Sequence, residues 1–493
     1  MDLLSARKKD NIFIIKRSEI TGRLDPHYNQ PLFSKLWDKL YLISGELTTL
    51  RKNSICIFSG ITPKSGGDAY TLNDGIPFVR SGDFSEMNEI DFSKLLRLKR
   101  EIHDGIMCGS QLQKNDLLIA IVGATIGKVG VYQYDIEANI NQAICAIRLK
   151  NTLNPYYVQA FFQTYIGQKI IERIKRPVAR ANINLEEVGN LPIPLLDLHK
   201  QNEIAQIMDD SRLQKQAKER EANALLASID DYLLSELGIE RPTIARTENG
   251  RFFYTSYKEV IGKRLDPLAY SEQAQKIKHA IINGKYPCSS LKSLTIQEAA
   301  GDWGIDITDD YDMQIYSKCL VLRSTEFNAH HNLVIDDAKA KYRLINKKKL
   351  QNIDLQINDL IIEKSGGSEN QPVGRIAIIT KNLWENDTLC YSNFVQKIRI
   401  NKNKVIPKYM YYFLRLVHNL KLTETMQSQT NGIRNLILSE YYAQQIPIPS
   451  IEKQRDIISQ IEVIYNKAIE LQKSAQEIIN KAKQEIEAMI LGE

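Results

Sequence analysis

The sequence repeats itself once, in two halves that share short motifs in the same order. Arg-Leu-Asp-Pro begins at Arg23 and again at Arg264, and a Pro-x-Pro pair at Pro192 recurs at Pro447. Further matches pair Phe78 with Val321, Asn115 with Asn358, Asn154 with Ile406 and Lys200 with Lys453. Chance does not supply so many matches in register, so the sequence predicts two diverged copies of one structural module.

Each half shows the same succession of patterns. An amphipathic helix opens it, short β-branched and aromatic runs form its body, and a helix after an Asn-Pro or Ile-Pro pair precedes the Pro-x-Pro corner. Because proline disfavours helix in the residue before it, each corner indicates a domain boundary. We therefore expect α/β (α+β) domains over residues 1–195 and 241–450, followed by long helices over 196–240 and 451–493.

Each long helix carries an apolar seam at helical spacing. The seam positions are Ile457, Ile461, Ile464, Leu471 and Ile478 in the second helix, and Ile204, Met208, Leu225 and Ile229 in the first. Only Glu485 breaks the second seam, whereas the first has a polar middle. A helix of this kind is stabilised chiefly by packing its apolar face, so we expect the two helices to pair as a coiled coil. The alternative is that each helix packs on the surface of its own domain.

Composition places few limits on function. Lys and Arg number 65 against 59 Asp and Glu, and this net charge of +6 is compatible with a polyanionic partner without establishing one. The six cysteines include no Cys-x-x-Cys pair, which predicts reduced thiols rather than a metal cluster or disulfides. The chain shows neither a signal-peptide pattern nor an apolar stretch long enough to span a membrane. We therefore expect a cytoplasmic protein with no membrane partner.

Three motifs come close to catalytic patterns without matching them. The loop Gly123–Lys128 is one residue short of a phosphate-binding loop, and Val129 replaces the hydroxyl residue that would bind magnesium. Asn154–Tyr157 lacks the second proline of an amino-methyltransferase turn. Asp359 with Glu363–Lys364 resembles a nuclease motif in spacing, but the first half has no equivalent. We therefore expect no catalytic site, no metal site and no cofactor in this chain.

The chain resembles the specificity (S) subunit of type I restriction–modification systems. The segments that carry the resemblance are Leu191–Pro194 with Lys200–Ile204, Ile446–Pro449 with Glu452–Ile457, the loop Val122–Gly130, and Thr430–Leu436. The resemblance implies two target recognition domains held apart by an antiparallel pair of helices, each domain reading one half of a split, asymmetric site in double-stranded DNA. It also implies partners: two methyltransferase (modification) subunits and motor–nuclease (restriction) subunits, which would use S-adenosylmethionine, ATP and Mg²⁺.

Base and phosphate recognition requires hydrogen-bond donors on loops or helix ends, and both halves concentrate such residues before the corner. The first half offers Lys175, Arg176, Arg180, Asn182 and Asn184, and the second Gln429, Thr430, Asn431, Arg434 and Asn435. The glycine-rich loops add Thr125 and Lys128, and Ser368, Asn370, Gln371 and Arg375. The equivalent residues Arg80 and Arg323 are further candidates, unless Asp83 and Glu326 hold them. For each single residue the alternative is a solvated loop without DNA contact.

Other functions remain open on sequence alone. The same plan suits the recognition subunit of a type II enzyme that cuts on both sides of its site. From other classes, the chain could be a methyltransferase with unusual motifs, or a coiled-coil scaffold without a nucleic-acid partner. The two Arg-Leu-Asp-Pro motifs are expected to pin the opening of each domain rather than to contact DNA.

Overall fold

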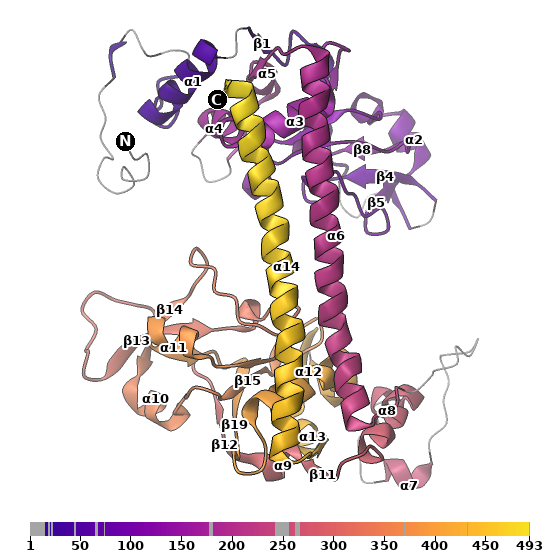
Figure 1. Ribbon diagram of the computed structural model, residues 1–493, viewed down its shortest axis with the longest axis vertical. Helices are drawn as coiled ribbons and strands as arrows, with labels where there is room; N and C mark the ends of the chain where they lie inside the picture. Colours follow the sequence, from indigo (N-terminus) through magenta and orange to yellow (C-terminus); the bar gives the residue numbers. More distant parts are fainter. Residues whose placement is uncertain are drawn as a thin grey trace. The chain divides into compact units, whose positions relative to one another are not determined.

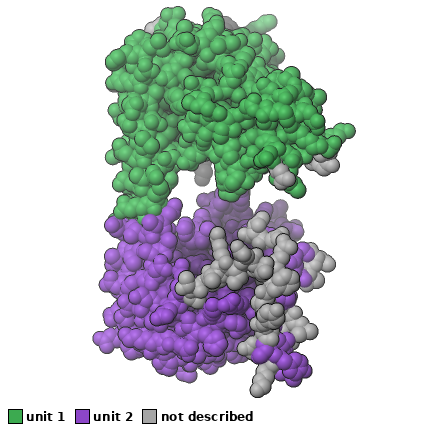
Figure 2. Space-filling model, turned by 90° about the vertical axis from the view of Figure 1, so that its right-hand side faces the viewer, with its two compact units in different colours: residues 1–221, 470–493 green, residues 222–469 purple. Residues whose placement is uncertain are grey.

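The computed structural model describes residues 15–492 apart from 18–19, 21–22, 44–45, 65–67, 73, 177–180, 242–255, 262–266, 369–370 and 431. The chain forms two compact units (Figure 2). Unit 1 comprises residues 1–221 and 470–493, and unit 2 comprises residues 222–469. Each unit therefore combines one recognition half with parts of both long helices. In the described residues, no helix is long and apolar enough to cross a membrane.

Unit 1 is built from short strands and helices ahead of the long helix α6 (Figure 1). Its strands are β1 (Leu47–Thr49), β2 (Ser54–Ser59), β3 (Tyr70–Thr71), β4 (Ile76–Val79), β5 (Leu96–Leu98), β6 (Leu117–Ala120), β7 (Val129–Val131), β8 (Asn139–Ile140), β9 (Ile144–Leu149) and β10 (Pro192–Pro194). Its helices are α1 (Pro31–Ile43), α2 (Arg100–Asp104), α3 (Pro155–Gln163), α4 (Tyr165–Ile174), α5 (Leu185–Gly189) and the start of α6 (Leu198–Leu237).

Unit 2 repeats this succession with longer insertions. Its strands are β11 (Cys288–Ser290), β12 (Thr295–Ala300), β13 (Tyr316–Leu322), β14 (Tyr342–Asn346), β15 (Leu360–Glu363), β16 (Ser365–Gly367), β17 (Ile376–Ile378), β18 (Leu389–Tyr391), β19 (Val395–Ile400), β20 (Gln427–Thr430), β21 (Ile433–Leu436) and β22 (Gln445–Pro447). Its helices are α7 (Tyr257–Val260), α8 (Glu272–Ile282), α9 (Leu291–Leu294), α10 (Lys347–Ile353), α11 (Lys381–Asn386), α12 (Pro407–Asn419), α13 (Leu438–Ala443) and the start of α14 (Ile451–Leu491).

The main sheets of the two units have the same topology, and their smaller sheets share single strand pairs. The main antiparallel sheet has the order β2-β9-β6-β7 in unit 1 and β12-β19-β15-β17 in unit 2. A second sheet contains one parallel pair in each unit, β4 with β8 and β13 with β18. Each Pro-x-Pro corner forms a strand that pairs with an early strand, β10 with β1 and β22 with β11. The predicted α+β duplication is therefore confirmed, although the units share few residue identities.

The glutamine of each Lys-Gln pair has a buried side-chain amide that binds main-chain groups. Gln201, near the start of α6, accepts a hydrogen bond from the Asn154 main-chain nitrogen (2.8 Å) and donates to the Thr152 and Leu196 carbonyl groups. Gln454 of α14 accepts one from the Ile406 nitrogen (2.8 Å) in the same way. Both glutamines are fully buried. Each thus fixes a long helix to the residue that precedes the first turn of α3 or α12.

The long helices pair in antiparallel fashion inside each unit, as the resemblance implies. In unit 1, Ile204 and Met208 of α6 share a hydrophobic cluster with Ile479 and Ile486, near the end of α14. In unit 2, the end of α6 and the start of α14 are joined by an ion pair between Glu236 and Lys453 (2.5 Å). α6 begins in unit 1 and ends in unit 2, and α14 runs from unit 2 into unit 1.

The buried face of these helices follows the predicted seam only in part. Of the predicted seam residues, Ile204, Met208, Ile229, Ile457 and Ile461 are buried, and Leu225, Ile464, Leu471 and Ile478 are half-buried. Leu226 is buried in place of Leu225, and Ile479 and Ile486 in place of Ile478 and Glu485. An α-helix turns every 3.6 residues rather than every 3.5, which shifts its buried face by about 20° per heptad. A strict heptad seam therefore loses register along these helices.

A buried arginine ties the long helix α6 to the aromatic helix of each unit. In unit 1, Arg212 of α6 donates to the side-chain oxygen of Gln163 on α3 (3.1 Å), and burial lowers the pKa of Arg212 to about 10. In unit 2, Arg415 of α12 donates to the Leu226 carbonyl oxygen of α6 (3.3 Å). The arginine therefore comes from α6 in one unit and from α12 in the other.

We predict that Gln201→Ala and Gln454→Ala each destabilise the protein by about 1–3 kcal/mol, because each leaves a part-buried main-chain nitrogen without its acceptor. The exposed neighbour Lys200 offers a matched control, and Lys200→Ala should leave stability unchanged. Thermal unfolding of the full chain measures all three. Glutamine variants as stable as the control would show that the amide does not hold the helix start.

Candidate nucleic-acid interface

In unit 1, the glycine-rich loop after β6 lies directly against the polar segment that precedes α5. The Ile183 nitrogen donates to the Ile121 carbonyl oxygen (3.0 Å), and the Gly123 nitrogen donates to the Ala181 carbonyl oxygen (3.1 Å). Gly123 and Gly127 both have positive φ, which lets the loop turn sharply between β6 and β7. The loop and the polar segment therefore form one edge of the unit, although they are far apart in the sequence.

Unit 2 contains the same junction, but here the polar segment forms β-strands. The Leu436 nitrogen donates to the Lys364 carbonyl oxygen (2.7 Å), as Ile183 does to Ile121 in unit 1. Here the polar segment is the hairpin of β20 and β21, which pairs with β16 to give the strand order β16-β21-β20. The Ser365 hydroxyl donates to the side-chain oxygen of Asn435 (2.7 Å). Both predicted DNA-contact segments thus lie at equivalent edges. We refer to these edges as the reading edges; their described residues belong to 121–128 and 175–184 in unit 1, and to 364–375, Phe394 and 427–436 in unit 2.

Lys128 and Arg375, which were predicted to contact DNA, form hydrogen bonds with main-chain carbonyl groups in the structure. The Lys128 ammonium donates to the carbonyl groups of Ser81 (2.9 Å) and Phe84 (2.7 Å), and burial lowers its pKa. The counterpart, Arg375, donates to the carbonyl groups of the matching residues Ser324 (2.9 Å) and Phe327. These cations fasten one turn onto the sheet. Two of the three Lys128 donors, and Arg375 donors on both terminal nitrogens, are therefore bound within the protein.

The carboxylates near Arg375 are also engaged within the protein. Arg375 is 8% exposed and forms a buried ion pair with Glu363 (2.8 Å), while Arg399 pairs with Asp359 (2.8 Å). The near match to a nuclease motif therefore consists of two structural ion pairs. In the part of the chain that the structure describes, no three His, Cys, Asp or Glu residues are grouped to hold a metal ion.

The equivalent arginines Arg80 and Arg323 are held by the acidic residues that follow them. Arg80 donates to both carboxylate oxygens of Asp83 (2.9 and 3.1 Å), and Arg323 forms an ion pair with Glu326 (2.5 Å). Both pairs lie in the turn that Lys128 or Arg375 fastens. The side chain of Arg80 is 46% exposed and that of Arg323 is 22% exposed. Arg80 is therefore the more accessible of the two.

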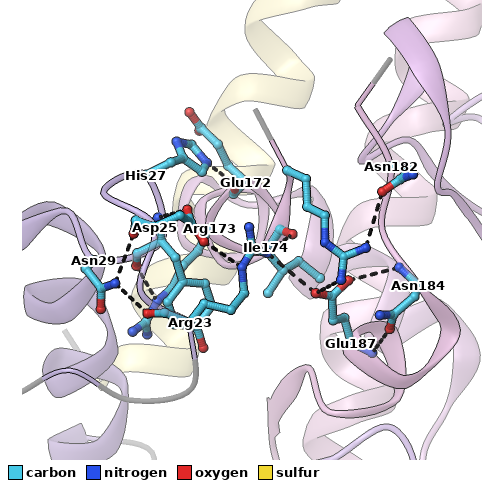
Figure 3. A network of polar contacts seen from close by, with 12 residues as sticks. Arg23, Asp25, His27, Asn29, Glu172, Arg173, Ile174, Asn182, Asn184 and Glu187 are labelled. Atoms are coloured by element: carbon cyan, nitrogen blue, oxygen red, sulfur yellow. Dashed lines mark hydrogen bonds and ion pairs between the residues drawn. The ribbon is translucent and has the colours of Figure 1, made fainter. Parts of the chain in front are cut away.

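Three side chains at the unit 1 reading edge belong to one network, centred on Glu187 (Figure 3). Arg176 pairs with Glu187 (2.9 Å) and donates to the side-chain oxygen of Asn182 (3.4 Å). Asn184 caps α5: its side chain accepts from the Glu187 nitrogen (2.7 Å), and Glu187 in turn accepts from the Asn184 nitrogen (3.0 Å). Asn182 and Asn184 are exposed. This network holds together the two described ends of the segment 175–184.

The other predicted contact residues are placed with fewer constraints. Lys175, Thr125 and Arg434 are half-buried, and Ser368, Gln371 and Gln429 are exposed. For Thr430 only the main chain is described, and it pairs with Ile433. Arg180, Asn370 and Asn431 lie outside the described residues.

One residue of the unit 2 reading edge was not predicted. Phe394 is 47% exposed, and its carbonyl oxygen accepts hydrogen bonds from Lys364 (2.9 Å) and Ser365 (3.2 Å), beside β16. At the matching position in unit 1, the carbonyl oxygen of Ala143 accepts from Ile121 (2.9 Å). An exposed aromatic ring at such an edge can stack on a base. The sequence offers no signal for it, because an aromatic residue directly before a strand has the same pattern as a residue that packs in the core.

Comparisons with known proteins find restriction–modification subunits. The model of the type I restriction modification DNA specificity domain matches residues 46–226 and 308–481. The EcoBI type I restriction enzyme specificity subunit of Escherichia coli is 29% identical over 167 residues, which span 34% of this chain and 35% of that subunit. The putative type I restriction enzyme MjaX specificity subunit of Methanocaldococcus jannaschii is 23% identical over 453 residues, 88% of this chain and 90% of that one. A type I restriction–modification S subunit from M. genitalium of known structure is 11% identical, with 90% of this chain and 95% of that chain covered and a TM-score of 0.38.

We predict that substitution of Arg375 lowers the stability of the protein, whereas substitution of Arg434 at the unit 2 reading edge does not. Arg375→Gln should destabilise the protein by about 3–5 kcal/mol, because it leaves the buried Glu363 carboxylate unpaired. Arg434→Gln should leave the melting temperature unchanged, because among the described residues the Arg434 side chain forms no hydrogen bond or ion pair. Thermal unfolding of both variants makes the comparison. Equal melting temperatures for the two variants would contradict the structural role of Arg375.

Proposed function

The chain belongs to the type I restriction modification DNA specificity family, and from this premise we propose that it reads a bipartite, asymmetric target in double-stranded DNA. Each unit would bind one half of the target through its reading edge. The observation that supports this proposal is that the same junction of glycine-rich loop and polar segment occurs once in each unit. Two edges on one chain suit a target with two separate parts.

The differences between the two reading edges support the asymmetry of the proposed target. Unit 1 presents Arg176 and Asn182, whereas unit 2 presents Gln429 and Arg434 on a β-hairpin, with Phe394 beside it. Arginine suits guanine, and asparagine or glutamine suits adenine. Edges with different donors in different backbone settings would select different bases. The common framework beneath the edges would leave the mode of docking unchanged.

The partners follow from the same proposal. Two methyltransferase subunits would dock, one for each copy of the repeated fold, and restriction subunits would join them to cleave unmodified DNA. The partner subunits would supply catalysis and use S-adenosylmethionine, ATP and Mg²⁺, so this chain would contribute recognition alone. The ion pairs that hold Asp359 and Glu363 are consistent with this division of roles.

The selection of DNA from a pool of random duplexes tests this function. The full chain, together with its methyltransferase partner, should enrich a consensus of two short parts separated by a spacer of unspecified sequence and constant length. Affinity should fall steeply with salt, since phosphate contacts release counterions. A single contiguous consensus would contradict a role for both units, and the absence of any consensus would contradict sequence-specific recognition.

A further inference from the structure

Glu187 binds two arginines with one carboxylate oxygen (Figure 3). Its Oε1 lies 2.9 Å from Nη2 of Arg176 and 3.5 Å from Nη1 of Arg23. Its Oε2 accepts the main-chain hydrogen bond from Asn184 that completes the cap of α5. The two oxygens therefore have separate roles, one in the local fold and one in charge pairing.

The two arginines are held to very different degrees. Arg23 belongs to the first Arg-Leu-Asp-Pro motif, and it also donates to the Ile174 carbonyl oxygen (2.8 Å) and to Asp25 (2.7 Å). Its side chain is 23% exposed. The Arg176 side chain is 40% exposed, and its second hydrogen bond reaches the exposed Asn182 at 3.4 Å. Arg23 is thus fixed by groups other than Glu187, whereas Arg176 has few constraints besides it.

The Arg176–Glu187 ion pair is part-buried, with 40% of the arginine side chain and 17% of the glutamate side chain exposed. Because solvent reaches the arginine side of the pair, the pair contributes little free energy and another anion can compete for Arg176. Arg176 lies at the unit 1 reading edge, where the proposed function brings a DNA phosphate. If Arg176 leaves Glu187, the carboxylate keeps Arg23 as a counterion and is not left unpaired. The arrangement therefore permits an exchange of partners at small cost.

Building on the proposed function, we propose that Arg176 exchanges Glu187 for a DNA phosphate when DNA binds, and that Arg23 remains as the counterion of Glu187. Glu187 then restrains Arg176 in the free protein and lowers the affinity for DNA of any sequence. The Arg-Leu-Asp-Pro motif acts at a distance from the DNA, as a positioning element of the unit 1 reading edge. The first Arg-Leu-Asp-Pro motif, which was expected only to pin the opening of the domain, would then also affect DNA binding.

A double-mutant cycle between Glu187 and Arg176 tests the exchange in the full chain with its methyltransferase partner, with a fluorescent duplex of random sequence as the probe. Glu187→Gln keeps the cap, because glutamine serves at this position of a capping box. It should raise the affinity about 2- to 5-fold, the range expected for releasing an ion pair that solvent reaches on the arginine side. Arg176→Gln should weaken binding and reduce the slope of log affinity against log salt by about 0.9, the loss of one phosphate contact.

The combined variant distinguishes exchange from a general effect of charge. With Arg176→Gln in place, Glu187→Gln should no longer raise the affinity. The control is Glu186→Gln, which removes the same charge from an exposed side chain one residue earlier on α5 and should change affinity less than Glu187→Gln. Equal gains from the two glutamine substitutions, or a Glu187→Gln gain that persists without Arg176, would overturn the exchange.

Arg23→Gln tests the second half of the proposal. It should weaken DNA binding about 2-fold, because Glu187 then has Arg176 as its sole arginine and holds it more tightly. This loss should disappear when Glu187→Gln is also present, and a loss of the same size in both backgrounds would overturn the role of Arg23. If the unaltered chain binds DNA but Arg176→Gln has no effect, the exchange fails and the proposed function stands. If the unaltered chain with its methyltransferase partner binds no duplex DNA, both fail.

Discussion

The buried amides of Gln201 and Gln454 are the contacts on which the arrangement of each unit depends. Each joins the start of a long helix to the residue that precedes the aromatic helix α3 or α12. The aromatic helix is held to the Pro-x-Pro corner as well, since Tyr157 and Tyr409 donate to the carbonyl groups of Pro194 and Pro447. A buried polar group is costly unless its hydrogen bonds are made, so this junction tolerates little variation. It therefore sets the direction in which each long helix leaves its unit.

Beneath the reading edges, the two units preserve bonds rather than residues. A lysine in one unit and an arginine in the other fasten the same turn, through carbonyl groups at matching positions. An aspartate in the same place pairs with an arginine on the neighbouring strand, Asp116 with Arg148 and Asp359 with Arg399. The edges themselves differ in donors and in backbone form. A constant framework with variable edges is the arrangement that a protein needs to change its target without changing its fold.

Much of the fold could be predicted from the sequence. Repeated motifs in the same order reveal the duplication, and helical periodicity is a local pattern. The contacts of the candidate site residues could be predicted less well. A cation beside a glycine-rich loop has the same sequence signal whether it binds phosphate or a main-chain carbonyl group, and only the position of a distant turn showed that Lys128 and Arg375 do the latter. The helix seam lost register at Ile478 because the heptad pattern ignores the true helical repeat. The sequence gives no signal for Glu187, because its partners Arg176 and Arg23 lie 11 and 164 residues away along the chain.

The central claim is that each unit reads its own half of one DNA target. Hydroxyl-radical footprinting of the full chain with its methyltransferase partner on a selected target tests this directly, with unaltered protein compared with the unit 2 variant Gln429→Ala/Arg434→Gln. The account predicts two protected stretches separated by accessible DNA, and the loss of protection in one stretch alone for the variant. A single continuous footprint, or the weakening of both stretches to the same degree, would contradict it.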